Sequence, residues 1–99
     1  PVGGRGGARA RTSVSDWTWD WNPSEGFLTE GLPPGVIAEV ERLATELAAL
    51  GPDSERVGRP FNREGGLREF DFLAGRGFIS FLPIPRHECV YICHITWTD

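Results

Sequence analysis

The amino-acid sequence predicts an α+β domain in which one amphipathic helix accompanies a small antiparallel meander. Apolar residues over 36–50 recur with the period of a helix. Three apolar runs of strand length follow near the C-terminus, at Leu67–Leu73, Phe78–Ile84 and Cys89–Trp97. An alternating Trp segment at 14–21 precedes the helix. The expected order is therefore an N-terminal strand, one or two helices, and a three-strand meander.

The alternating segment at 14–21 places Trp17, Trp19 and Trp21 on one face of the predicted strand. Period two with aromatic residues is typical of an antiparallel or edge strand. We interpret the Trp face as cover for the core. Two alternatives, a stacking platform for bases and a partner-binding patch, would both need exposed rings.

The helix is predicted to open at Pro33-Pro34-Gly35, because proline suits the first helical turn, and to end at Gly51-Pro52. A short helix or turn around Phe27 and Leu28 comes before it. Glu39, Glu41, Arg42 and Glu46 are expected to face away from the sheet. The expected buried stripe consists of Val36, Ile37, Val40, Leu43, Ala44, Leu47 and Leu50.

Residues 52–66 are predicted to form a loop that is rich in arginine, either a solvated loop or a basic rim beside a site. In the first meander strand Phe70 and Phe72 alternate with Glu69 and Asp71, which indicates one wet face. The last strand is apolar throughout and is expected to be central and covered on both sides.

Composition limits the possible functions. The chain has 99 residues, one domain at 14–99 by our prediction, and a net charge of −4, so its overall field does not attract polyanions. Residues 1–13 hold four Gly and three Arg and are expected to be a disordered arm, either a linker or a contact to phosphate. No apolar run is long enough for a membrane span.

Neither a disulfide nor a metal site is expected from the two cysteines, Cys89 and Cys93. In a strand their Cα atoms would lie about 13 Å apart, whereas a disulfide needs less than about 7 Å. His87 and Cys93 would be about 20 Å apart, too far for one zinc ion. Two free thiols suit a cytoplasmic protein, and no cofactor-binding motif is present.

A helix that ends in Leu-Gly-Pro, a basic loop with a Gly-Gly pair, a GLREF strand and a GRGFISF strand follow one another over roughly residues 15–97. In this order they resemble the RelE/ParE toxin superfamily of type II toxin–antitoxin systems. The resemblance implies a RelE-like twisted sheet with helices on one face and a cognate antitoxin as partner. RelE-like members cut mRNA on the ribosome, and ParE-like members poison DNA gyrase.

RNA cleavage needs a base for the 2′-hydroxyl, an acid for the leaving oxygen and cations for the phosphate. The resemblance implies Glu69 as base, His94 as acid and Arg76 as cation. His87 is an alternative acid, and Arg68 and Arg86 are alternative cations. Glu69 and Asp71 stand where the family has positively charged residues, and Phe78 stands where the family has Arg. Further RNA-binding candidates are Arg59, Arg63, Arg68 and Arg86.

The strand register decides whether Glu69 and His94 can meet. Strict alternation predicts His94 on the face of Val90 and Ile92, opposite Cys93 and Ile95.

Three functions follow from this sequence. The first is a RelE-like toxin that inhibits translation by cleaving mRNA. The second is a non-catalytic module on the same fold that binds an antitoxin or gyrase, which the acids at Glu69 and Asp71 favour. The third is a small nucleic-acid-binding domain that uses the Trp face and the Arg arm. Partners would thus be an antitoxin and possible RNA or ribosome contacts, with no membrane, metal or cofactor.

Overall fold

A computed structural model describes residues 16–61 and 66–98, and these form an α+β domain with one long helix and a five-stranded mixed sheet. The predicted arm at 1–13 and residues 62–65 lie outside the described residues. Both helices and the three meander strands occur where the sequence predicts them. The elements are β1 Thr18–Trp21, α1 Glu25–Thr29, α2 Pro34–Leu50, the 3-10 helix Gly51–Arg56, β2 Arg59–Pro60, β3 Arg68–Phe72, β4 Gly77–Ile84, the 3-10 helix Pro85–His87 and β5 Cys89–Trp97.

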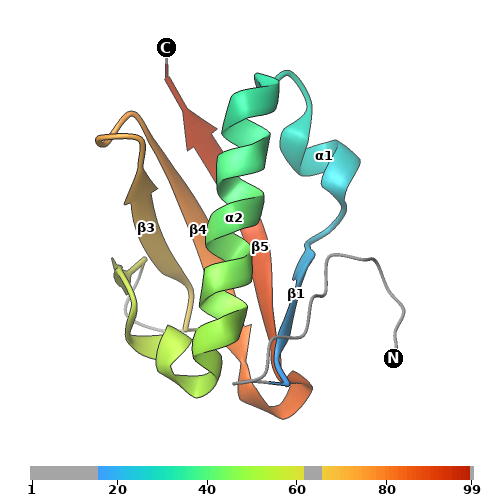
Figure 1. Cartoon of the computed structure of the whole chain (residues 1–99), viewed down its shortest axis with the longest axis vertical. Coiled ribbons are helices and arrows are strands. Elements are labelled where there is room, and N and C mark those ends of the chain that lie inside the picture. The colour runs from blue at the N-terminus through green and yellow to red at the C-terminus, as the bar shows by residue number, and fades with distance from the viewer. Residues whose placement is uncertain (1–15, 62–65, 99) are drawn as a thin grey trace.

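The strands are ordered β1-β5-β4-β3-β2, with α2 lying across one face of the sheet (Figure 1). The meander β3-β4-β5 is antiparallel. The edge position of β1 agrees with the prediction, but its antiparallel alternative is wrong, since β1 runs parallel to β5. The two helices between β1 and the meander provide the long connection that a parallel pair requires.

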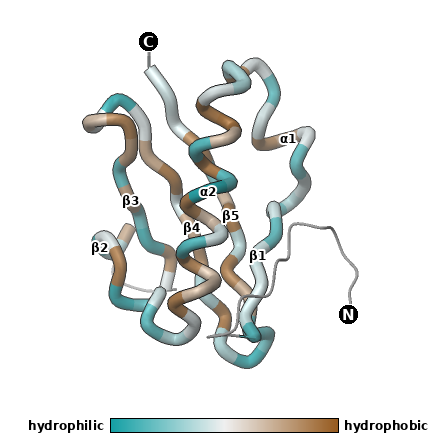
Figure 2. The backbone as a smooth tube through the Cα atoms, viewed as in Figure 1, coloured by the Kyte–Doolittle hydropathy of each residue, from teal (hydrophilic) through white to brown (hydrophobic). Residues whose placement is uncertain are grey.

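The core lies between α2 and the sheet, and both helices contribute to it from the same side. Figure 2 shows hydrophobic stretches along α2, β4 and β5 and hydrophilic residues at the turn between β4 and β5. Val40 and Ala44 of the predicted stripe are fully buried, but Ile37 is only half-buried and Leu50 is exposed. Leu50 closes the helix beside the Gly51 cap, beyond the part that packs on the sheet. Among the described residues, no helix is both long and apolar enough to cross a membrane.

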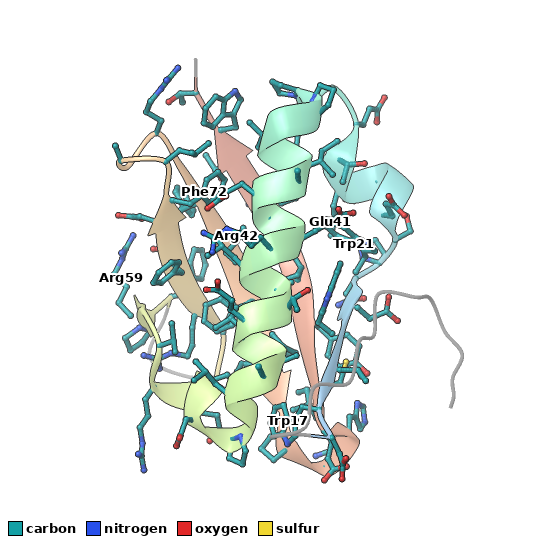
Figure 3. All side chains as sticks on the ribbon, viewed as in Figure 1. Trp17, Trp21, Glu41, Arg42, Arg59 and Phe72 are labelled. Carbon is teal, nitrogen blue, oxygen red and sulfur yellow. The ribbon has the colours of Figure 1, made fainter. Side chains whose placement is uncertain are left out.

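The Trp face of β1 covers the core, as predicted. Trp17 and Trp19 are buried, and Trp21 packs half-buried against the same cluster. Trp17 and Trp21 lie toward opposite ends of β1 (Figure 3). Trp19 donates its indole N–H to Thr45 Oγ1 at 3.2 Å, which joins β1 to α2 through the one polar atom of a buried ring.

The described part of the predicted loop, residues 52–61, contains two regular elements. It begins with a 3-10 helix and then adds the short strand β2, in which Arg59 pairs with Glu69. Gly58 makes this approach possible, because its φ is +71° and an added Cβ would lie 2.0 Å from the Glu69 carbonyl oxygen. The prediction missed β2 because two paired residues leave no periodic pattern.

A β-bulge decides which residues of β5 face the helices. Ile92 pairs with Phe81 but His94 pairs with Ser80, so Cys93 is the extra residue. Val90 and Ile92 are buried in the core, and after the bulge Ile95 and Trp97 pack against it. The predicted face of His94 is therefore wrong, since strict alternation does not continue through a bulge.

The prediction that β5 is covered on both sides is also wrong. The strand lies inside the sheet, between β1 and β4, but both helices pack on one side only. We call the other side the open face; by the register it carries Glu69 and Asp71 of β3, Phe78 and Ser80 of β4, and Tyr91, His94 and Thr96 of β5.

Replacing Gly58 by alanine should destabilise the protein by about 2–4 kcal/mol, because the methyl group meets backbone and the residue stays at positive φ. Gly35→Ala is the matched control: nothing lies within 4 Å of its added Cβ, and α2 should gain up to about 1 kcal/mol. Urea denaturation measures both, and equal stability of the two variants would contradict the close approach of β2 to β3.

Candidate functional site

A single row of polar side chains crosses four strands of the open face. Arg59 of β2 is the cross-strand partner of Glu69, Glu69 of Ser80, and Ser80 of His94. Cross-strand partners in an antiparallel sheet project from the same face. The register therefore brings the predicted residues Glu69 and His94 to one side of the sheet, in line with each other.

Arg59 is held by two carboxylates of β3. Its Nη2 lies 3.0 Å from Glu69 Oε1 and 3.0 Å from Asp71 Oδ1, and its Nε donates to Glu69 Oε1 at 3.1 Å. The hydrogen bond to Asp71 holds the pKa of Arg59 above its usual value, so the guanidinium keeps its charge. Arg59 lies at the edge of the sheet that is far from β1 (Figure 3). Arg59, a predicted RNA-binding residue, thus lies beside Glu69, the predicted general base.

His94 is exposed at the other end of the row. Its Nδ1 lies 3.4 Å from Thr96 Oγ1, two residues further along the same strand. This contact orients the imidazole through one nitrogen and leaves Nε2 for a substrate. An imidazole is the side chain that most often serves as a general acid or base in catalysis.

The spacing of the row suits a small group held between an acid and a base. Glu69 and His94 lie two strands apart, so their Cα atoms are about 10 Å from each other. Only Ser80 stands between them, and its side chain is shorter than either neighbour. A phosphodiester placed over Ser80 would have the carboxylate on one side and the imidazole on the other.

Arg76 does not join this group. Its guanidinium lies over the Trp97 ring, 5.0 Å from the centroid, and that ring stacks on Phe72 at 6.4 Å. Trp97 and Phe72 belong to the helix-covered side of the sheet. The structure therefore separates Arg76 from Glu69 and His94, because the turn after β3 directs it toward the aromatic pair.

The other predicted RNA-binding arginines have different surroundings. Arg68 donates to the Val57 carbonyl at 2.6 Å and to the Gly58 carbonyl at 3.2 Å, so it holds the backbone ahead of β2. Arg86 is exposed in the turn between β4 and β5. Arg63 lies outside the described residues.

The alternative acid His87 lies in the same turn and is paired elsewhere. Its Nδ1 is 2.9 Å from the Tyr91 hydroxyl, and the two rings meet edge to face. His87 is not a partner in the row that contains Glu69.

Cys89 and Cys93 are both free thiols. Burial raises the pKa of Cys93, which keeps this thiol protonated and weakly nucleophilic at neutral pH. Within 16–61 and 66–98, no group of three His, Cys, Asp or Glu side chains is placed to hold a metal ion.

Sequence reasoning missed Ser80. It is one of two buried polar residues of the described chain, with 2% of its surface exposed. The signal was present in the sequence, since GFISFLPI carries one hydroxyl in an otherwise apolar strand. Only the cross-strand register shows that this hydroxyl lies between Glu69 and His94.

No protein-family model, characterised protein or solved structure gives a significant match to this chain.

Replacing Arg68 by lysine should lower stability by about 1–2 kcal/mol, because an ammonium group cannot keep both bonds of the guanidinium fork. Arg86→Lys is the control, and its effect should stay within about 0.5 kcal/mol, as for an exposed residue. Urea denaturation measures both. An Arg68→Lys protein as stable as the wild type would contradict the role of Arg68 in holding the backbone ahead of β2.

Proposed function

We propose that the protein is an endoribonuclease whose site is the row Arg59, Glu69 and His94 on the open face. The observation that carries the proposal is the continuous register from β2 to β5, which aligns a cation, a carboxylate and an imidazole. These three chemical groups are what cleavage of a phosphodiester by its own 2′-hydroxyl requires.

In this proposal Glu69 removes the proton from the ribose 2′-hydroxyl, and the 2′-oxygen attacks phosphorus. The bond from phosphorus to the 5′-oxygen breaks as protonated His94 gives its proton to that oxygen. The products are a 2′,3′-cyclic phosphate and a 5′-hydroxyl end. Arg59 stabilises the negative charge that builds on the phosphate oxygens, and Asp71 keeps its guanidinium in place.

Single-stranded RNA is the substrate that fits this surface. Neither of the described helices covers the open face, which leaves a sheet surface along which an extended strand can lie. Phe78, half-buried and two residues before Ser80, shares the face and offers a ring on which a base can stack.

The broader assignment is a RelE-like toxin of a type II toxin–antitoxin system, acting in the cytoplasm on mRNA and neutralised by a cognate antitoxin. The order of elements supports it: a strand, two helices and a three-strand meander, with the helices on one side. An open sheet face that carries the polar row is where such a toxin would have its site.

A non-catalytic, ParE-like module that binds an antitoxin or gyrase is the second candidate. The charge of the open face favours it, because Glu69 and Asp71 together outnumber the single guanidinium of Arg59 that they hold. The net charge of −4 points the same way.

Glu69→Gln and His94→Asn should each slow cleavage of a single-stranded RNA at least about 100-fold, because each removes one proton transfer. Mass spectrometry of the fragments should find 2′,3′-cyclic phosphate ends with the wild type, with or without added ribosomes. Glu46→Gln on the outer side of α2 and His87→Asn are the controls and should keep full activity. Cleavage that survives Glu69→Gln would remove this residue from the mechanism.

Expression in bacterial cells separates the two candidates. A ribonuclease toxin should stop growth and shorten mRNA, and His94→Asn should restore growth because it removes the acid. Growth arrest that persists with His94→Asn, with intact mRNA, would support the interaction module instead. Immunoblots of both strains control for equal amounts of protein.

A further inference from the structure

The hydroxyl of Ser80 is buried but makes no hydrogen bond within the part of the chain that the structure describes. Ser80 is only 2% exposed. A buried hydroxyl without a partner costs free energy, and native proteins contain few of them. Ser54, the other buried polar residue of the described chain, follows the rule, since its Oγ donates to the Gly51 carbonyl at 2.7 Å.

The direction of the Ser80 side chain connects it to the open face. Ile79 and Phe81, its neighbours in β4, are fully buried on the helix side, so alternation turns Ser80 away from them. Its cross-strand partners on that side are Glu69 and His94. A group that reaches Oγ from solvent must therefore come in between the carboxylate and the imidazole.

We propose that Ser80 is a phosphate-binding residue, whose hydroxyl donates a hydrogen bond to a non-bridging oxygen of the phosphodiester held between Glu69 and His94. This inference rests on the proposed ribonuclease site. A hydroxyl fixed in a strand can meet the developing charge without reorganising, which is how preorganised donors stabilise a transition state. The unsatisfied hydroxyl of the free protein is the structural cost of that preorganisation.

Replacing Ser80 by alanine should lower activity without lowering stability. Ser80→Ala removes an unpaired polar group, so the urea midpoint should stay the same or rise, because no hydrogen bond is lost. The same substitution should lower kcat/KM of RNA cleavage about 10- to 100-fold, since the hydroxyl binds the phosphate and this bond strengthens as charge develops. Ser54→Ala is the matched control: it should lower the urea midpoint and leave kcat/KM unchanged.

A binding measurement makes the test independent of cleavage. A 2′-deoxy dinucleotide, which lacks the attacking hydroxyl, is titrated into the wild type and Ser80→Ala while NMR follows the ring signals of His94. Saturable shifts in the wild type that weaken at least several-fold in Ser80→Ala support the phosphate site, even if no RNA is cleaved and the proposed ribonuclease activity fails. Cleavage and binding that are the same in Ser80→Ala and wild type would overturn the inference, as would a clear loss of stability in Ser80→Ala.

Discussion

The β-bulge at Cys93 fixes which side of the sheet each residue of β5 occupies, and both the core and the polar row follow from it. Before the bulge, Val90 and Ile92 enter the core; after it, Ile95 and Trp97 do so. A regular strand would turn Ile95 and Trp97 to solvent and His94 toward the helix, which would expose apolar surface and bury a polar ring. One extra residue thus keeps β5 apolar toward the helix on both sides of the bulge and gives the open face its imidazole.

The same register makes a site from residues that are distant in sequence. Arg59 reaches the row only because β2 adds to β3, and β2 forms where Gly58 allows two backbones to approach closely. Arg68 holds the carbonyls of Val57 and Gly58 from the helix side. The structural support for Arg59 therefore lies on the opposite side of the sheet from the proposed chemistry.

The charged groups of the open face interact over short distances. Glu69 and Asp71 share Arg59, so the guanidinium needs no long-range field to remain charged and in place. An acidic protein gains little from steering of RNA over long distances. Contacts at the row itself, together with stacking on an aromatic ring, would have to supply the affinity.

Local sequence patterns were enough to predict the elements: the helix at Pro34–Leu50, the three meander strands and the buried Trp face follow from periodicity and turn residues. The sequence also indicated Glu69 and His94 as candidates. Tertiary packing set the parallel pairing of β1, the strand β2, the side of the sheet that His94 occupies, the separation of Arg76 from the site and the position of Ser80. The turn after β3 places Arg76, and the others depend on register between strands, which arises from packing across the sheet and leaves no periodic mark on the chain.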